Sequence, residues 1–241
     1  MLQTMVRTRE EIKEYLKELK AWLDSVREQP VEGMSDFFSS RIGIYEDVHL
    51  KNFAGEYEHI ASFFEDGLRS LLDIGCGTGP ELESLFSRFP DLKVTGVDLC
   101  ETMLDKLIRK YGGKDIEIIR ADYFEYPYER NRYDAATSFE TLHHFKYDKK
   151  RQIYDKLYHA IKPGGYYIEC DYIACCDEEE AMCLESYEYR RRKNGVPDDA
   201  FVHIDIPITF ERQAELMKNA GFKAVELLNL NGGTAIIKAV K

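Results

Sequence analysis

Long apolar runs are absent from this 241-residue chain. No window comes near the roughly 18 consecutive apolar residues that a membrane-spanning helix needs. Residues 1–20 carry a charge every few positions and lack the apolar core of a secretory signal. We therefore expect a cytoplasmic protein that has no membrane partner.

A disulfide framework is also absent. The six cysteines have no regular spacing, and a chain of this length buries a sufficient core without cross-links. Cys170, Asp171, Cys175 and Cys176 include no C-x-x-C pair, and neighbours on a strand point to opposite faces, which argues against a soft metal site. We expect reduced thiols and no bound metal.

Positive charge is scarce, with 33 lysines and arginines against 44 acidic residues and a net charge of -11. Because affinity for a polyanion comes mainly from basic side chains, nucleic acid is not an expected partner. The one basic run, YRRRKNG at 189–195, follows the acidic CDEEE at 176–180. The pair predicts an exposed helix with oppositely charged ends, and the sequence leaves open whether the run 190–193 has a function.

Short apolar strands alternate with helical patterns from Leu71 onward, which predicts a parallel sheet covered by helices on both faces. Before them, TREE is a capping box that predicts a helix from about Thr8 to Val26. Two strand-like runs around Asn231 and Gly233 predict a closing hairpin, so the last strand would run antiparallel to its neighbour. Residues 175–208 are longer than a simple crossover requires.

The stretch LLDIGCGTGPEL at 71–82 places glycines on the first strand-to-helix turn, where an open parallel sheet binds its ligands. A dinucleotide fingerprint would need its third glycine at the position of Pro80. A phosphate loop would need a lysine after the glycines, and none follows. Both of these nucleotide-binding motifs are thereby excluded.

Carboxylates follow the next two strands. Asp98 ends the second strand, where it can accept hydrogen bonds from both hydroxyls of a ribose. Asp122 ends the third and can accept from an exocyclic amine such as that of adenine. Leu99 and Met103 can then sandwich a purine. A lone aspartate at a strand end is more often a helix cap than a ligand, but the glycines and both aspartates at three successive strand ends favour a nucleoside site.

These segments together resemble the class I S-adenosylmethionine-dependent methyltransferases. LLDIGCGTG resembles their first motif, VTGVDLCETML the second, IRADYFEYPY the third and YDAATSFETLHHF the fourth. The helix and strand LYHAIKPGGYYIECDY follow, so the resemblance spans about residues 55–175. It implies an α/β, doubly wound, Rossmann-like, seven-stranded and mostly parallel sheet with an antiparallel last strand. N-terminal helices and a helical insertion before strand 6 would be added to it.

The resemblance also implies a domain organisation and a cofactor. Residues 1–54 would form an N-terminal helical lead-in or lid, and 55–241 the S-adenosylmethionine-binding domain, with 175–208 as a substrate cap. S-adenosyl-L-methionine would be converted to S-adenosyl-L-homocysteine. The implied cofactor-binding residues are Asp73, Gly75, Gly77 and Gly79 at the methionine end, Asp98 at the ribose, Leu99, Met103, Asp122 and Tyr123 at the adenine, Ser138 and Phe139 beside the sulfonium, and Arg41 and Tyr45 at the cofactor carboxylate.

Candidate catalytic residues follow the fourth strand, in SFETLHHF. His143 or His144 can remove a proton from an acceptor atom, and Glu140 can bind a substrate amine. The same histidines can also simply begin a helix or close a loop. Aromatic residues of the lead-in and the insertion are expected to be lid and substrate walls: Phe37, Phe38, Tyr45, Tyr187, Tyr189, Phe201 and His203.

The phrase N-P-P-[YF], with which similar nucleic-acid and protein amide methyltransferases grip a planar amine, is absent after the fourth strand. The predicted function is therefore methyl transfer to an O, N or C atom of a small metabolite, by a monomer or homodimer. Two alternatives stay open. One is a cofactor-modifying enzyme of the carboxy-S-adenosylmethionine synthase type, for which Arg190, Arg191 and Arg192 could bind a carboxylate. The other is a non-catalytic S-adenosylmethionine-binding module.

Overall fold

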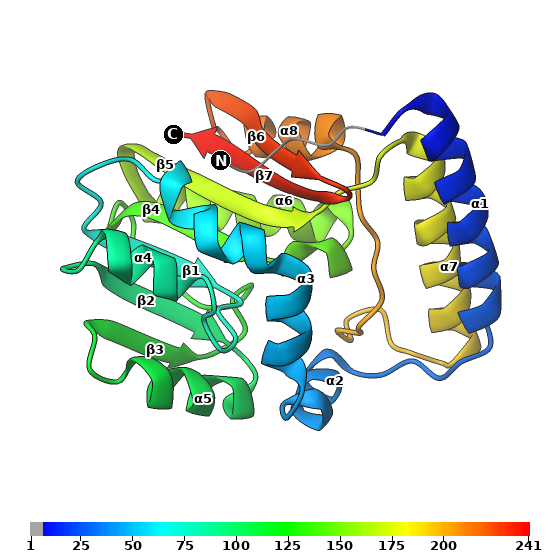
Figure 1. Ribbon diagram of the computed structural model, residues 1–241, viewed down its shortest axis with the longest axis horizontal. Coiled ribbons are helices and arrows are strands. Elements are labelled where there is room, and N and C mark those ends of the chain that lie inside the picture. The colour runs from blue at the N-terminus through cyan, green and yellow to red at the C-terminus, as the bar shows by residue number, and fades with distance from the viewer. Residues whose placement is uncertain (1–6) are drawn as a thin grey trace.

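A computed structural model describes residues 7–241, except for the side chains at positions 45, 46, 49 and 50. Its centre is one seven-stranded sheet in the order β3-β2-β1-β4-β5-β7-β6 (Figure 1). Strand β7 pairs antiparallel with β5 and β6, and the other pairs are parallel. The predicted sheet and its antiparallel last strand are confirmed.

The strands and helices have the following bounds. The strands are β1 (Ser70–Ile74), β2 (Lys93–Asp98), β3 (Ile116–Arg120), β4 (Tyr133–Phe139), β5 (Ile161–Tyr172), β6 (Ala224–Asn231) and β7 (Thr234–Val240). The α-helices are α1 (Arg9–Val26), α2 (Met34–Arg41), α3 (Tyr45–His59), α4 (Leu82–Arg88), α5 (Glu101–Tyr111), α6 (Tyr147–Ala160), α7 (Asp177–Lys193) and α8 (Phe210–Asn219), with short 3-10 helices at Ile60–Phe63 and Leu142–His144.

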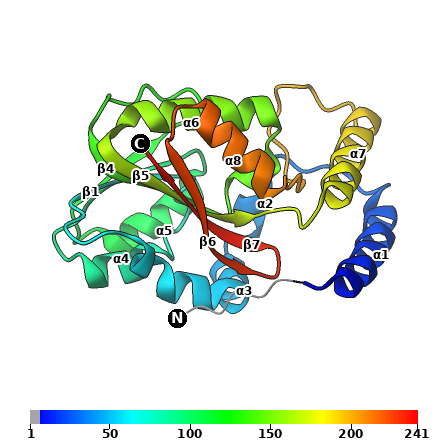
Figure 2. The ribbon, with the colours of Figure 1, turned by 90° about the horizontal axis from the view of Figure 1, so that it is seen from above.

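Helices cover both faces of the sheet, with α4 and α5 on one side and α6 and α8 on the other (Figure 2). Because neighbouring strand residues point to opposite faces, Leu71 packs in the core under α4 and α5 while Leu72 packs in the core under α6 and α8. Both leucines are fully buried. The doubly wound arrangement therefore brings the carboxyl ends of β1, β2 and β4 to one edge, where a ligand can enter.

Helix α1 lies beside α7, away from the sheet (Figures 1 and 2). It begins one residue after Thr8, whose hydroxyl accepts from Glu11 N at 3.3 Å while the Glu11 carboxylate accepts from Thr8 N at 2.6 Å. This is the predicted capping box. Tyr15 ties the two helices together, because its hydroxyl donates to the Glu179 carboxylate at 2.6 Å.

Helix α7 has the predicted acidic first turn and basic last turn, but it is not exposed throughout. Arg191 is only 4% exposed. Its guanidinium donates to the Tyr187 hydroxyl and the Ala200 carbonyl, each at 2.9 Å, and to the Pro197 carbonyl. The prediction of a solvated basic face is therefore wrong at Arg191, since the following loop folds back over it.

The lead-in and the insertion meet beside the sheet. Gly33 pairs with Val202 as an isolated antiparallel bridge, Met34 N donates to the Phe201 carbonyl at 3.0 Å and His203 N donates to the Glu32 carbonyl at 3.1 Å. The expected division at 54/55 falls inside α3. Two segments separated by about 170 positions therefore fold as one unit over the ligand edge.

All six cysteines are free thiols. Within residues 7–241, no helix is both long enough and apolar enough to cross a lipid bilayer.

Candidate active site

The glycine turn after β1 is held in a backbone conformation that favours glycine. Gly75 has φ +65° and Gly77 has φ +50°. A Cβ at Gly75 would lie 2.4 Å from Thr141 Cγ2, so the chain passes too close to Thr141 for any side chain. At Gly77 the added atom would lie 3.3 Å from Met103 Cε. No side chain therefore covers the backbone of this turn at Gly75 and Gly77, on the edge of the sheet where a ligand can enter.

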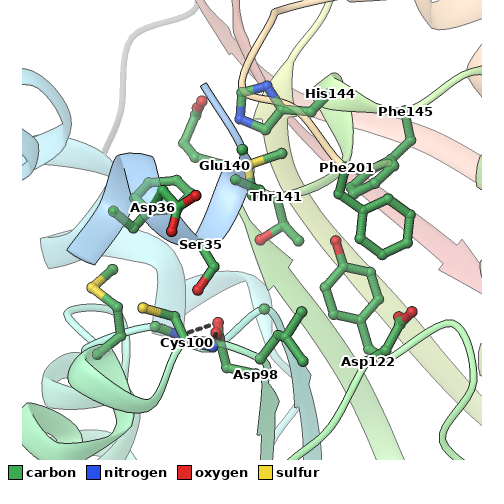
Figure 3. Close-up of a pocket in the computed structure, with 18 of the residues that line it drawn as sticks. Ser35, Asp36, Asp98, Cys100, Asp122, Glu140, Thr141, His144, Phe145 and Phe201 are labelled. Carbon is green, nitrogen blue, oxygen red and sulfur yellow. Dashed lines mark hydrogen bonds between the residues drawn. The ribbon is translucent and has the colours of Figure 1, made fainter. Parts of the chain in front are cut away.

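A cavity of about 330 Å³ opens at this turn (Figure 3). Its walls come from the ends of β1, β2, β3 and β4, from α2 and from the insertion. The predicted residues among its lining are Gly75, Gly77, Asp98, Leu99, Met103, Asp122, Tyr123, Phe139, Glu140 and His144, together with the expected aromatic walls Phe38 and Phe201. The others are Gly33, Met34, Ser35, Asp36, Cys100, Thr141 and Phe145.

Asp98 and Asp122 are fixed by backbone N–H groups. The Asp98 carboxylate accepts from Gly77 N at 3.0 Å and from Cys100 N at 2.7 Å (Figure 3). Asp122 Oδ1 accepts from Phe124 N at 2.8 Å. Burial raises the pKa of Asp98, although the backbone donors oppose this rise. Both carboxylates still line the cavity, so they act as local caps and remain available to a ligand.

Leu99 and Met103 differ in solvent exposure. Met103 is 3% exposed, whereas Leu99 is 47% exposed, which is unusual for a large apolar side chain beside a cavity. A flat apolar ligand that entered the cavity would cover Leu99. This pair therefore fits the aromatic part of a nucleoside.

Asp73 is fully buried at the end of β1, where no N–H group donates to its carboxyl and its hydrogen-bond partner is the carboxyl of Glu81. Burial and the nearby carboxyls of Glu81 and Asp98 raise its pKa well above the ordinary value. A buried carboxylate is costly unless a cation or an N–H donor reaches it. The ammonium group of the methionine tail of S-adenosylmethionine would satisfy this requirement, so Asp73 fits the cofactor although it does not line the cavity wall.

Other predicted cofactor residues lie elsewhere. Ser138 is fully buried and its hydroxyl is 2.6 Å from the Tyr167 hydroxyl, so it does not line the cavity. Gly79 packs against Leu82 at the start of α4. Arg41 lines a neighbouring cavity, where both of its terminal nitrogens donate to Glu32, at 2.8 and 2.9 Å. The side chain of Tyr45 lies outside the described residues.

The neighbouring cavity, which we call the second cavity, has a volume of about 280 Å³. It shares Phe38, Glu140 and His144 with the first cavity. The two spaces therefore meet beyond the end of β4. The remaining lining of the second cavity consists of Phe37, Arg41, Ile44, Val48, Phe53, His143, His203 and Asp205.

Glu140 lines both cavities, and Figure 3 shows it in the wall of the first. Its φ of +48° lies in the left-handed region, which a non-glycine residue adopts only at a cost. The Glu140 amide donates to the Cys170 carbonyl at 2.7 Å, which helps to hold this conformation. Burial raises the pKa of its carboxyl to about 8. Strain and a perturbed carboxyl at one position are typical of functional sites.

The His143 ring is held in place by Asp171, a fully buried residue of β5. The distance from His143 Nδ1 to Asp171 Oδ1 is 2.5 Å, and Asp171 Oδ2 also accepts from Leu142 N at 2.8 Å. Burial opposes a charged imidazole, but the Asp171 and Asp205 carboxylates outweigh it and raise the pKa of His143 to about 9. His143 lines only the second cavity, where its Nε2 lies 3.7 Å from Asp205 Oδ1.

His144 borders both cavities and differs from its neighbour in charge. Burial and the adjacent His143 lower its pKa, so that its imidazole is neutral. His203 comes from the insertion and stacks on Phe37 with ring centroids 3.4 Å apart. Burial and His144 lower the pKa of His203 to about 3.

Several residues of the site are missed by the sequence patterns. Asp171 and Asp205 carry no motif, and Met34 to Asp36 are distant in the chain from every strand end. The one available signal was the pair His203 and Asp205, which alternate along an extended segment and so share one side of it. Among the expected aromatic walls, Phe37, Phe38, Phe201 and His203 line a cavity, whereas Tyr187 and Tyr189 line neither of these two.

The described geometry agrees with comparisons to known proteins. The family described as a methyltransferase domain matches residues 71–165. A carboxy-S-adenosyl-L-methionine synthase of Campylobacter lari is 25% identical in a 219-residue alignment that covers 84% of this chain and 93% of that protein. One from Campylobacter concisus is 30% identical in a 164-residue alignment that covers 64% of this chain and 69% of that protein.

Solved structures give the same fold. Mitomycin 7-O-methyltransferase superposes with a TM-score of 0.67 at 15% identity, over 94% of this chain and 67% of that one. The chain covers 57% of the length of another S-adenosylmethionine-dependent methyltransferase, SibL, with a TM-score of 0.62 at 15% identity. The chain belongs to the class I S-adenosylmethionine-dependent methyltransferases. It is an enzyme whose cofactor is S-adenosylmethionine.

Proposed function

We propose that this enzyme transfers the methyl group of S-adenosylmethionine to an O, N or C atom of a small molecule bound in the second cavity. The observation that carries the proposal is the junction of the two cavities at Glu140, His144 and Phe38. A donor in the first space and an acceptor in the second would meet there, screened from water. Alignment and water exclusion are what this displacement requires, because the sulfonium is already activated.

In the proposed reaction, an electron pair of the acceptor forms a bond to the methyl carbon. The carbon–sulfur bond breaks, and its electrons remain on sulfur, so that S-adenosylhomocysteine leaves as a neutral thioether. The acceptor's proton passes to a neighbouring base or to water. His143, His144 and Glu140 are the groups that we propose to face the acceptor, because they gather on its side of the junction.

We propose that the cofactor lies with its ribose on Asp98, its adenine between Leu99 and Met103, and its methionine ammonium toward Asp73. The bare glycine turn, the half-exposed Leu99 and the buried Asp73 carboxyl, to which no N–H group donates, support this orientation. Arg41 is not assigned to the cofactor carboxylate, since its guanidinium is already paired with Glu32.

The relatives named carboxy-S-adenosyl-L-methionine synthase support a second candidate, in which the cofactor itself gains a carboxyl group. Such an enzyme must neutralise an additional carboxylate. Among the described residues that line the two cavities, Arg41 is the only lysine or arginine, and Glu32 already accepts both of its terminal nitrogens. Arg191 is engaged by loop carbonyls. These contacts favour methyl transfer.

Mass spectrometry of the nucleoside recovered from purified protein separates the two candidates. We expect S-adenosylmethionine or S-adenosylhomocysteine, because the described cavity walls offer no free cation to a further carboxylate. The sample should also be incubated with S-adenosylmethionine and a metabolite extract before analysis. Recovery of a carboxylated nucleoside would show that the second candidate is correct.

A further inference from the structure

The second cavity brings together ligand atoms of three side chains from two parts of the chain. His143 and His144 come from the turn after β4, and Asp205 comes from the insertion. One side-chain N or O atom from each lies within 4.8 Å of the other two. We propose that His143, His144 and Asp205 bind one divalent transition-metal ion, which holds the methyl acceptor. This inference rests on the proposed function for its role, but not for the binding itself.

The separations between the ligand atoms suit a shared ion. Metal bonds of about 2.0 to 2.2 Å at tetrahedral or octahedral angles place two ligand atoms roughly 2.8 to 3.6 Å apart. His144 Nδ1 lies 3.1 Å from Asp205 Oδ1, and His143 Nε2 lies 3.7 Å from the same oxygen. A small shift of the His143 ring would bring the second distance into this range.

His144 and Asp205 already lie against one another. The His144 side chain is 3% exposed, and its Nδ1 pairs with Asp205 Oδ1 at a distance of 3.1 Å. A metal ion that entered between the nitrogen and the carboxylate would replace this one contact with two bonds to the ion.

His143 has the arrangement that orients a metal-binding imidazole. Asp171 holds its Nδ1 at 2.5 Å, and this leaves Nε2 to face Asp205. A carboxylate behind the ligating histidine fixes the ring and its tautomer in many metal sites. Asp171 is itself fixed, because it accepts from the Leu142 and Tyr172 amides. We therefore assign Asp171 as a positioning residue.

Two imidazoles and one carboxylate select the class of ion. Mg²⁺ and Ca²⁺ prefer sets made of oxygen atoms, whereas nitrogen-rich sets favour Zn²⁺, Co²⁺, Mn²⁺ or Fe²⁺. Three protein ligands leave coordination positions open, and these would face the second cavity. The acceptor would accordingly be a molecule with an oxygen or nitrogen donor beside the atom that is methylated. With the ion bound, His144 acts as a ligand and not as a proton acceptor.

The first test is titration calorimetry of chelator-treated protein with MnCl₂ or CoCl₂ alone. We expect one ion per chain. Asp205→Asn and His144→Ala should each weaken binding by at least about 10- to 100-fold, the range found even for residues behind the ligands, and Asp171→Asn should fall within that range. With Co²⁺ bound, the absorption spectrum of Asp171→Asn should differ from that of the parent, because Asp171 orients His143. If Asp171 had only a structural role, the spectrum would stay the same.

Matched controls separate this cluster from other ligands. His159→Ala and Asp155→Asn change exposed residues of α6 and should leave the titration unchanged. Cys175 Sγ and Cys176 Sγ lie 3.9 Å apart, so these two thiols are the competing ligands to exclude for a soft ion. The double variant Cys175→Ser/Cys176→Ser should also bind as the parent does.

Three outcomes would overturn the inference: no binding to the parent protein, binding unchanged in both Asp205→Asn and His144→Ala, or binding lost only in the double cysteine variant. The first would leave an ion-pair cluster without a metal. S-adenosylmethionine binding is measured on the same samples in chelator and checks the fold of each variant. Cofactor binding and methyl transfer that persist without metal would sink only this inference, whereas metal binding without methyl transfer would sink only the proposed function.

Discussion

Gly75→Ala is expected to cause the largest loss of cofactor binding of any single methyl addition at the turn. The new Cβ would lie 2.4 Å from Thr141 Cγ2 and 2.8 Å from its Oγ1, in a backbone with φ +65°. Left-handed strain and overpacking together cost roughly 2 to 5 kcal/mol. We expect this cost to appear as weaker S-adenosylmethionine binding in calorimetry and as a lower midpoint of denaturant unfolding.

The double variant Gly75→Ala/Thr141→Ala tests whether the contact with Thr141 causes the loss of binding. Removing Cγ2 and Oγ1 relieves the closest contacts, so it should recover part of the loss and leave the backbone strain. Gly113→Ala is the control, because a Cβ there meets nothing within 4 Å. The free energy of unfolding of Gly113→Ala should differ from that of the parent by less than about 0.5 kcal/mol. Cofactor binding by Gly75→Ala equal to that of the parent would contradict the geometry described for the turn.

Asp98→Ala is expected to weaken S-adenosylmethionine binding by about 1.5 to 3 kcal/mol, or roughly 10- to 150-fold. The reason is the loss of a carboxylate that can accept from both ribose hydroxyls. Asp105→Ala, an exposed position on α5, should bind as the parent does. Calorimetry measures both variants.

Loss of the two backbone contacts of Asp98, to Gly77 N and Cys100 N, would also weaken binding, so a second ligand is needed. An S-adenosylhomocysteine analogue without the ribose hydroxyls should bind the parent more weakly than the natural nucleoside does. In Asp98→Ala the analogue and the natural nucleoside should bind equally. An equal preference for the hydroxyls in both proteins would refute the ribose assignment.

The cofactor half of the site could be predicted because its signals are local. Gly75, Asp98 and Asp122 each stand directly after a strand, and parallel strands bring such positions to one edge. Ser138 was misplaced by the same logic. Ser138 lies in β4 near its carboxyl end, as predicted. Its side chain, however, is buried beside the Tyr167 hydroxyl and does not line the cavity.

The half that we propose for the acceptor could not be predicted in the same way, because it forms where the lead-in contacts the insertion, through the Gly33–Val202 bridge and the hydrogen bonds beside it. The neighbouring contacts bring His203 onto Phe37 and Asp205 toward His144. No period or motif in the sequence encodes this contact between the lead-in and the insertion. Burial of Arg191 depends on the same insertion and was missed for the same reason.

The most direct test of the central claim is incubation of the enzyme with S-adenosylmethionine that carries a deuterated methyl group, together with a metabolite extract. Mass spectrometry then follows the label. Our account predicts that S-adenosylhomocysteine accumulates while one small metabolite acquires the deuterated methyl group. Label that stays entirely on the nucleoside in active, cofactor-bound protein would contradict methyl transfer to a small molecule.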